Sequence, residues 1–455
     1  MQNTRENRMG TMPIPKLLLT LATPMALSML VQALYNIVDS IYVSRVNEAA
    51  LTALSLAFPL QNLMIAVVSG FGVGVNALLS RSLGARQYDR ANRAAGNGLF
   101  LCICGWLLFL LFGIFGAEMF ISAQTSDPTI KQYGVEYLRI VSMFSICLYG
   151  QLMLERLLQA TGRSFYSMIA QVTGAVTNII LDPIFIFGYL GVPAMGVKGA
   201  AIATIFGQCL ATGLALFFNL KFNPDIQLRV KNMIPDRNTI VDILKVGIPT
   251  TVMQSIGSVM TFSMNKILIA FSSTAVAVFG VYFKLQSFVV MPVLGINGAM
   301  VPILSFNYGA RQPKRIMDAL KIGMLSAFVL MCCGTILFEV APVPLLTMFD
   351  ASADMMHMGT AALRIIAIHF PVAAFCIICG SAFQSLGYSL YSMYTSIMRQ
   401  LVVLIPAAWL LSLTGNVNMV WLAFLIAEVM SLVCSVYFLR RVYRAKIAPM
   451  LEETK

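Results

Sequence analysis

Residues 84–87 read Gly-Ala-Arg-Gln, and the same tetrapeptide returns at residues 309–312, an offset of 225 positions. At the same offset, QATGRSFYSM (159–168) shares six residues with QSLGYSLYSM (384–393). Further identities pair Pro24 with Pro249, Phe58 with Phe283, Gln61 with Gln286, Gly70 with Gly295 and Ser80 with Ser305. A single register held over this length predicts that the chain consists of two similar halves.

The composition places both halves in a membrane. Of the 455 residues, 58% are hydrophobic and only 11% are charged, and the mean hydropathy is +0.81, which excludes an ordinary soluble globular protein. At about 20 apolar residues per helix, this length accommodates roughly a dozen spans. Candidate spans lie near residues 15–45, 50–80, 93–116, 131–155, 164–188, 196–221, 240–271, 275–305, 316–338, 359–385, 389–413 and 418–439. We therefore predict an all-α polytopic membrane protein with 12 transmembrane helices.

The repeat also predicts how the two halves are related. Because six spans, an even number, separate equivalent positions, both halves cross the membrane in the same direction, as two six-helix bundles in a parallel pseudo-two-fold repeat. We expect an N-terminal bundle (N-lobe) over residues 1–221, a cytoplasmic linker over 222–239, and a C-terminal bundle (C-lobe) with a basic cytoplasmic tail over 240–455. Paired bundles of this kind suit alternating access to a site near the middle of the membrane.

Lys and Arg residues set the expected orientation. They are frequent in the loops after spans two and eight, in the linker and in the C-terminal tail, whereas the loops between spans seven and eight, nine and ten, and eleven and twelve contain none. By the positive-inside rule, even-numbered loops and both termini are cytoplasmic in a multi-pass protein of a plasma (inner) membrane. The net charge of +12 is spread over short loops, so we expect membrane lipids rather than nucleic acid as partners, and a monomer.

Enzyme signatures are absent from the sequence. There is no phosphate-cradling Gly-x-x-x-x-Gly-Lys-Ser/Thr and no His-Glu-x-x-His, and the only histidines are His357 and His369. The nine cysteines all fall in apolar segments at spacings that indicate neither disulfides nor zinc ligands, so we interpret them as packing residues. These features favour a secondary transporter that is not an enzyme, needs no cofactor and is not driven by ATP.

Polar residues in the first span form one candidate site. An amide, a phenol, a second amide and a carboxylate share one helix face at spacings i, i+3, i+4 and i+7, and these residues are Gln32, Tyr35, Asn36 and Asp39. A polar stripe within a membrane must face protein or water, and an embedded carboxylate is a functional candidate by default. The alternative is that the stripe only holds helices together through hydrogen bonds.

Span five carries a second candidate site. Asn178 and Asp182 lie one turn apart on one face, and Pro183 leaves the carbonyl of Ile179 without its helical partner. Carboxylates, an amide oxygen and a freed carbonyl suit a hard cation, so Na⁺ at Asp39, Asn178 and Asp182 is the one metal candidate. The same carboxylates could instead carry a proton, because burial and a like-charged neighbour both favour the protonated form of a carboxyl group.

Two further residues are candidates with simpler alternatives. Thr204 in span six could complete the cation site, although an ordinary helix–helix hydrogen bond is the simpler interpretation. Glu155 precedes Arg156 near the end of span four, where it is either a salt-bridged carboxylate at the interface or a group that recognises a cationic substrate. The embedded Arg399 has either the backbone or Glu428 as its candidate partner.

Several of these features together resemble a known family. Pro24 lies fifteen residues before Asp39, the element Asn178-x-x-x-Asp182-Pro183 occurs in span five, and the segments YNIVDSIYVSR (35–45) and LLQATGRSFYSM (157–168) add local similarity. Combined with two parallel halves of six spans, this pattern resembles the multidrug and toxin extrusion (MATE) family, and within it the bacterial, staphylococcal-type multidrug exporters. The resemblance covers nearly the whole chain.

The resemblance implies efflux of cationic or amphipathic organic compounds across a bacterial plasma membrane, coupled to inward flow of H⁺ or Na⁺. It places the coupling cation at Asp39, Asn178, Asp182 and Thr204, and it matches Gln32 and Tyr35 to neighbouring polar positions. One branch of the family also uses acidic residues in spans seven and ten, but this sequence has only Asp242 at the mouth of span seven and none within span ten. Coupling is therefore expected to rest on the first half.

The expected function is secondary active multidrug antiport by alternating access, with the drug recognised in the cleft between the halves. A flippase for a lipid-linked precursor is one alternative, but it would carry a more basic central cavity and often additional spans. A non-transporting membrane receptor or scaffold, whose polar residues serve only packing, is another alternative.

Overall fold

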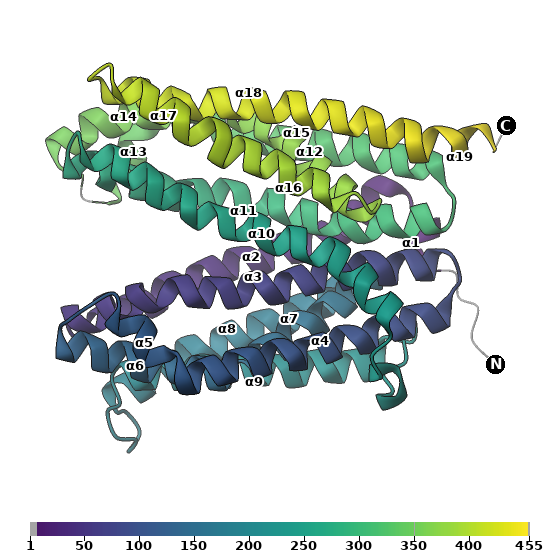
Figure 1. Cartoon of the computed structure of the whole chain (residues 1–455), viewed down its shortest axis with the longest axis horizontal. Helices are drawn as coiled ribbons and strands as arrows, with labels where there is room; N and C mark the ends of the chain where they lie inside the picture. Colours follow the sequence, from purple (N-terminus) through teal and green to yellow (C-terminus); the bar gives the residue numbers. More distant parts are fainter. Residues whose placement is uncertain (1–6, 350, 454–455) are drawn as a thin grey trace. The chain divides into compact units, whose positions relative to one another are not determined.

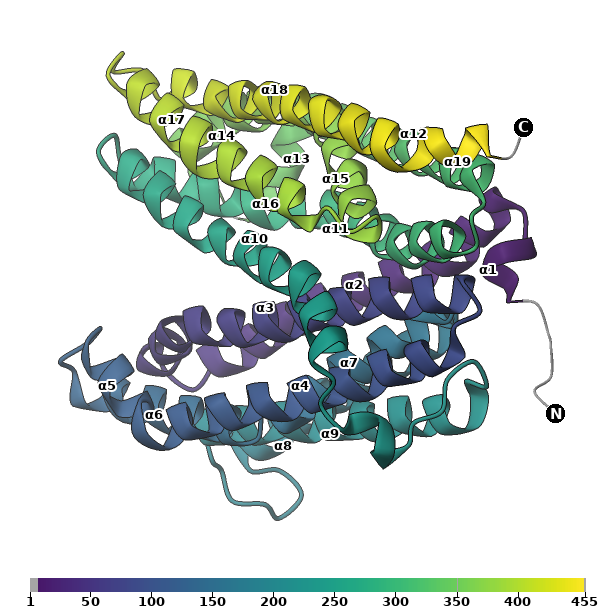
Figure 2. The same ribbon diagram turned by 45° about the vertical axis from the view of Figure 1, so that its right-hand side comes forward.

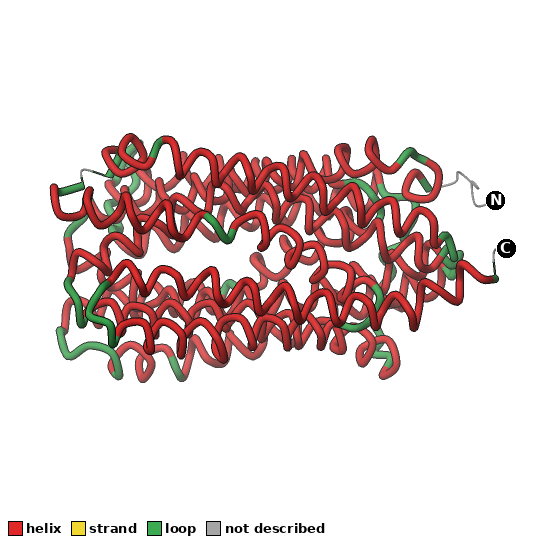
Figure 3. Tube along the Cα trace, turned by 90° about the horizontal axis from the view of Figure 1, so that it is seen from above, coloured by secondary structure: helices red, strands yellow, loops and turns green. Residues whose placement is uncertain are grey.

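The computed structural model describes residues 7–349 and 351–453 of the chain. All regular secondary structure in these ranges is helical, as the red segments of the tube in Figure 3 show. The chain forms two compact units. We call Leu27–Thr251 the N-unit, and Met1–Ala26 together with Val252–Lys455 the C-unit. The predicted all-α class is confirmed.

Most helices belong wholly to one unit and can be followed by label in Figure 1. The N-unit contains α3 (Glu48–Gly84), α4 (Tyr88–Phe115), α5 (Ala117–Ser122), α6 (Pro128–Met143), α7 (Ile146–Ala160), α8 (Ser164–Phe187), α9 (Val197–Phe222) and the short η1 (Val230–Met233). The C-unit contains α1 (Arg8–Thr11), α11 (Ser273–Gly309), α12 (Pro313–Val340), α13 (Pro342–Thr347), α14 (Ala353–Ala367), α15 (Phe370–Ser385), α16 (Ser389–Ile397), the π-helical η2 (Met398–Leu404), α17 (Ile405–Ser412), α18 (Val417–Val442), the π-helical η3 (Tyr443–Ile447) and α19 (Ala448–Glu452). Two long helices, α2 (Ile14–Ser44) and α10 (Arg237–Ile269), contribute to both units.

Helices α2 and α10 change unit at equivalent positions of the repeat, 225 residues apart. The first part of α10 packs on α3, where a Cβ atom added to Gly70 would lie 2.5 Å from the carbonyl oxygen of Gly247. The first part of α2 packs on α11 in the same way, because a Cβ atom on Gly295 would lie 2.6 Å from Cα of Ala26. Both contacts bring helix backbones together, and only glycine leaves room for them.

The edges of these units differ from those of the expected lobes, 1–221 and 240–455. Helices α2 and α10 are continuous through Pro24 and Pro249. The first part of α2 belongs to the C-unit, which holds the later half of the chain, and the first part of α10 belongs to the N-unit. A hydropathy pattern assigns a whole helix to one half, because it carries no information about a helix that packs against two bodies. The N-lobe, linker and C-lobe stay a prediction as functional domains.

The predicted repeat is confirmed by the helix bounds. Helices α3 and α11 begin and end 225 residues apart, and so do α4 and α12. The caps repeat as well: Asn47 accepts a hydrogen bond from the N–H of Ala50 (2.7 Å), and Ser272 accepts one from the N–H of Ala275 (3.1 Å). The two halves therefore start the same long helix with the same capping geometry.

The repeated tetrapeptides form the same turn in both halves. After α3 and α11 end, Arg86 and Arg311 both adopt a left-handed backbone, with φ of 57° and 52°. Nearby, Ser80 donates a hydrogen bond to a carbonyl of α7 (2.8 Å), and Ser305 donates one to a carbonyl of α15 (3.4 Å). Equivalent residues thus make equivalent tertiary contacts.

The register of the repeat shifts once, before the last helix of each half. The loop 188–196 joins α8 to α9, whereas the loop 413–416 between α17 and α18 is five residues shorter. Helix α18 consequently begins 220 rather than 225 residues after α9 begins. Positions in α9 and α18 are therefore compared at an offset of 220.

The helices account for the twelve expected spans. Nine helices of the described ranges are individually long and apolar enough to cross a membrane. Two bent pairs, α6 with α7 at 47° and α14 with α15 at 49°, raise this number to eleven. The remaining segment is α10, which has 33 residues, lies where the seventh span was expected, and is less apolar than the nine single helices.

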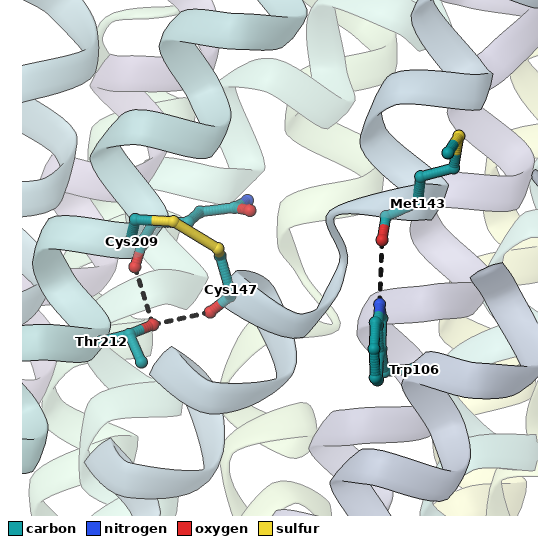
Figure 4. Close-up of a disulfide and its surroundings, with 6 residues drawn as sticks. Trp106, Met143, Cys147, Cys209 and Thr212 are labelled. Atoms are coloured by element: carbon teal, nitrogen blue, oxygen red, sulfur yellow. Dashed lines mark hydrogen bonds between the residues drawn. A yellow bond between two sulfur atoms is a disulfide. The ribbon is translucent and has the colours of Figure 1, made fainter.

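Side chains from neighbouring helices donate hydrogen bonds to backbone carbonyl groups at the bend between α6 and α7 (Figure 4). Trp106 Nε1 donates to the carbonyl of Met143 (2.9 Å), which the interruption leaves without its helical partner, and Thr212 donates to the carbonyl of Cys147 (2.8 Å). Cys147 and Cys209 form a disulfide between α7 and α9, with their Cα atoms 4.9 Å apart. The expectation of unpaired cysteines is wrong for this pair, because helix packing rather than sequence spacing brings the two residues together.

The linker is fixed to the N-unit. Asp236, the residue before α10, accepts hydrogen bonds from the side chain and the N–H of Thr239, which hold the pKa of this carboxyl group below its usual range. Asn97 of α4 donates to the carbonyl of Asn232 (3.2 Å) and accepts from the N–H of Asp236 (2.8 Å). These contacts agree with the packing of the first part of α10 on α3.

Candidate functional site

Asn178 and Asp182 lie on one face of α8 and meet Thr204 of α9, and all three residues are buried. With its amide oriented to satisfy its neighbours, Asn178 accepts a hydrogen bond from the backbone N–H of Thr204 (2.9 Å) and donates one to Oδ2 of Asp182 (2.9 Å). The structure therefore brings three of the predicted residues together. Their role in binding a cation stays a prediction.

Two glycines let α8 and α9 approach this closely. A Cβ atom on Gly207 would lie 2.6 Å from the carbonyl oxygen of Gly174 and 3.2 Å from Cβ of Asn178. A Cβ atom on Gly174 would lie 2.9 Å from the carbonyl oxygen of Gly207. A side chain at either position would push the helices apart, so the glycines are what allow Asn178 to reach across to α9.

Asp39, on the second part of α2, completes the cluster. Its carboxyl group lies against that of Asp182, and the hydroxyl of Tyr35 lies against that of Thr204. Oδ1 of Asp39 and Oδ1 of Asp182 are buried and have no hydrogen-bond partner within residues 7–349 and 351–453. Within the same ranges neither carboxylate forms an ion pair with a basic residue. The result is a largely buried group of oxygen atoms whose negative charge no basic residue of the described ranges balances.

Two residues that the sequence did not single out for this site border it. Tyr137 of α6 is buried and interacts electrostatically with Asp39 and Asp182. Gln61 of α3 donates a hydrogen bond from Nε2 to the hydroxyl oxygen of Tyr137 (2.9 Å), which leaves the hydroxyl hydrogen available to the carboxylates. In the sequence, the repetition of Gln61 at Gln286 could have pointed to the first residue. A phenol within a predicted span could have pointed to Tyr137.

The other predicted polar residues lie outside the cluster. Gln32 lies three residues before Tyr35 on α2, and its amide oxygen accepts a hydrogen bond from Gln171 of α8 (3.4 Å). Asn36 is exposed, at the edge of the stripe that Gln32, Tyr35 and Asp39 form on α2. Glu155 is buried on α7, where it accepts a hydrogen bond from Gln151 of its own helix (3.0 Å).

The buried carboxylate of the C-unit has a basic partner. Oε2 of Glu428 on α18 lies 3.3 Å from Nη1 of Arg399 in η2, so Glu428 is the partner that the sequence left open. His369 and Tyr282 lie near this ion pair. Asp242, the one acidic residue at the start of the seventh span, forms an ion pair with α4 (3.0 Å).

The donor atoms of the Asp39–Asp182 cluster limit what it can bind. In the part of the chain that the structure describes, no three His, Cys, Asp or Glu side chains gather as a metal site. The cluster offers two carboxylates, an amide oxygen and hydroxyl groups, and α8 continues through Pro183, which frees the carbonyl of Ile179. Hard oxygen donors of this kind suit an alkali cation or a proton rather than a transition metal.

The family described as MatE matches residues 24–184 and 249–410, most of both halves. The chain belongs to the MATE family. Multidrug export protein MepA of Staphylococcus haemolyticus (strain JCSC1435) is 25% identical over 419 residues, which cover 91% of this chain and 90% of that protein. MepA of Staphylococcus aureus (strain MSSA476) is 23% identical, with 91% of each chain covered. A solved structure described as the outward-facing conformation of a multidrug resistance MATE family transporter of the MOP superfamily shares 25% identity and a TM-score of 0.91, with 98% of this chain and 99% of that chain covered.

Membership of the MATE family confirms the resemblance drawn from the sequence. The chain is a multi-pass membrane transporter with the two-lobed, 12-helix MATE fold, and it is not an enzyme. MATE transporters need no cofactor and are ion-coupled.

Proposed function

We propose that this MATE transporter exports cationic or amphipathic organic compounds in exchange for H⁺ or Na⁺, by alternating access, in a bacterial plasma membrane with both termini cytoplasmic. Relatives described as multidrug export proteins support the substrate class. The observation that carries the coupling proposal is the contact between the carboxyl groups of Asp39 and Asp182 without a basic partner in the described ranges.

Electrostatics explains why this contact would couple an ion to transport. Two carboxylates that touch in a buried site cannot both stay ionised unless a positive charge compensates them. A proton on one carboxyl group, or a Na⁺ ion held by both carboxylates with Asn178 and Thr204, would supply that charge. Binding and release then change the net charge of the cluster, and this change can favour one conformation of the transporter over another.

Recognition of the organic substrate is proposed for polar residues of α2 and α7 and for apolar surface. Glu155 is the proposed partner of a positively charged substrate, with Gln32, Tyr35 and Asn36 of α2 as further polar contacts. The 29 Met and 29 Phe residues provide soft, adaptable apolar surface of the kind that promiscuous binding sites use.

Transport in proteoliposomes tests the proposal. The full chain is reconstituted, a proton gradient or a Na⁺ gradient is imposed separately, and movement of a fluorescent lipophilic cation is followed. The wild-type protein should move the dye against its gradient with at least one of the two ions, and Asp39→Asn and Asp182→Asn should each slow this movement by roughly 10- to 100-fold. Glu428→Gln is the matched control, because it removes a buried carboxylate that already has a basic partner.

Other outcomes would contradict the proposal. Undiminished ion-driven transport in both Asp39→Asn and Asp182→Asn would exclude this cluster as the coupling site. Dye binding without directional movement under either gradient would favour a receptor or scaffold. Movement of a lipid-linked precursor in place of the dye would favour the flippase alternative.

A further inference from the structure

One face of α18 is exposed along its whole second half. The exposed apolar residues Ile426, Val429, Met430 and Val433 recur at helical spacing, and the exposed Tyr437 continues the row. The opposite face of the helix is buried and carries Glu428. In a membrane protein, an exposed apolar row of this kind contacts lipid acyl chains.

The same face ends in three arginines. Arg440, Arg441 and Arg444 follow Tyr437 at spacings of three, four and seven residues, so all of them lie on the face that carries the apolar row. Together with Ala445 they line a hollow of about 510 Å³. Here α18 is followed by the π-helical η3 (Tyr443–Ile447). Figure 2 shows that the same helical segment continues from α18 into α19.

No carboxylate of the described residues forms an ion pair with these arginines. Ion pairs hold other basic residues of the chain, such as Arg90 with Asp242 (3.0 Å) and Arg163 with Asp225 (3.2 Å). For Arg440, Arg441 and Arg444 there is no such pair within residues 7–349 and 351–453. Three guanidinium groups around one hollow, with no acidic partner among the described residues, have the charge and geometry to bind an anion.

The spacing along the helix identifies what kind of anion fits. Seven residues separate Val433 from Arg440 and fourteen separate Ile426 from it, about 10 and 21 Å of helix, which bracket the roughly 15 Å of hydrocarbon in one leaflet. An acyl chain that lies along the apolar row would therefore place its phosphate at the arginines. Tyr437 lies between the two regions, at the depth where aromatic side chains of membrane proteins gather.

We infer that the exposed face of α18 is a binding site for an anionic phospholipid, whose acyl chains pack on residues 426–433 and whose headgroup phosphate is bound by Arg440, Arg441 and Arg444. The continuous apolar row favours a lipid over a free phosphate ion, because a free ion would make no use of it. The inference does not depend on the coupling ion or on the transported compound.

Native mass spectrometry of the purified full chain tests this site. Phosphatidylglycerol and phosphatidylcholine with identical acyl chains are supplied separately, and the retained lipid is counted. Each basic residue near an anionic headgroup strengthens binding about fivefold, so Arg440→Gln/Arg441→Gln/Arg444→Gln should retain phosphatidylglycerol at least about tenfold less than the wild-type protein. Phosphatidylcholine should be retained weakly by both proteins.

Two variants separate site-specific binding from general charge. Arg229→Gln/Lys231→Gln/Arg237→Gln removes the same charge from exposed linker residues and should leave phosphatidylglycerol retention unchanged. Arg440→Lys/Arg441→Lys/Arg444→Lys keeps the charge and should retain most of the binding, which also shows that the segment still folds. Equal loss in the tail and linker variants, equal loss in the Lys and Gln variants, or displacement of the lipid by inorganic phosphate would overturn the inference.

Discussion

The two units hold their buried carboxylates in opposite electrostatic settings. In the N-unit, Asp39 and Asp182 lie against each other without a basic partner in the described chain, whereas Glu428 in the C-unit pairs with Arg399 at 3.3 Å. A carboxylate that a guanidinium already balances gains little from a further cation, while two unbalanced carboxylates require one. This difference supports the proposal that ion coupling rests on the first half of the chain.

The ion pair of the C-unit lies at the counterpart of the α8–α9 crossing, which in the N-unit lies beside the carboxylate contact. In the N-unit, Gly174 of α8 and Gly207 of α9 bring the two backbones into contact. At an offset of 225, Gly174 corresponds to Arg399, and at an offset of 220, Gln208 corresponds to Glu428. At this crossing the N-unit has two glycines, whereas the C-unit has the ion pair between Arg399 and Glu428. The helix that carries Arg399 is π-helical there, as η2. A duplicated scaffold thus carries two different chemistries.

The largest expected effect concerns transport. Asp182→Asn should lower the rate of gradient-driven export by roughly 10- to 100-fold, because hydrogen bonds to charged groups contribute about 1.5–3 kcal/mol. The double variant Asp39→Asn/Asp182→Asn should be no slower than either single variant, because the two carboxyl groups act as one unit. Initial rates in proteoliposomes measure both effects. A loss in Glu428→Gln as large as that in Asp182→Asn would remove the contrast between the units.

The next effect concerns stability. Arg399→Gln leaves the carboxylate of Glu428, which is 3% exposed, buried without its partner, and should lower the free energy of unfolding by about 3–5 kcal/mol. Glu428→Gln should cost less, because the side chain of Arg399 is 31% exposed and can reach other polar groups. Thermal unfolding in detergent measures the order, and Arg399→Gln/Glu428→Gln should recover part of the loss. Equal melting temperatures for the two single variants would show that the pair is not held as described.

A smaller effect tests the close approach of α8 and α9. Gly207→Ala should destabilise the N-unit by about 1–3 kcal/mol and slow transport, because the new methyl group meets the backbone of Gly174 and moves Thr204 away from Asn178. Gly213→Ala is the matched control on the same helix, since no atom lies within 4 Å of its added Cβ. Thermal unfolding and transport rates should distinguish the variants, and equal behaviour would mean that the glycine contact does not position the cluster.

The smallest effect tests what the two units share. Arg86 and Arg311 have the same left-handed backbone, which costs a residue with a side chain about 1–2 kcal/mol. Arg86→Gly should therefore raise the free energy of unfolding by about 0.5–1 kcal/mol. This gain is smaller than the relieved strain, because glycine also increases the entropy of the unfolded chain. Arg311→Gly should gain slightly less, because it also loses an exposed ion pair with Glu453. A decrease in melting temperature for either variant would contradict a strained turn at that position.

The sequence by itself determined the helical class, the twelve segments and the repeat. Long apolar runs have to be helical in a membrane, because every backbone polar group must be satisfied within the segment. Helical periodicity also placed Asn178 with Asp182, and Asp39 with Tyr35 and Gln32, since residues three or four positions apart share a face. Each of these conclusions needs only local information along the chain.

Only the tertiary structure decided which faces meet. That Asp39 lies against Asp182, that Tyr137 and Gln61 border them, and that Cys147 pairs with Cys209 all depend on how separate helices pack. Periodicity gives the face on which a residue lies but not the neighbour opposite it. That neighbour is set by close backbone contacts such as those of Gly174 with Gly207 and Gly70 with α10, where the size of one side chain decides whether two helices can touch.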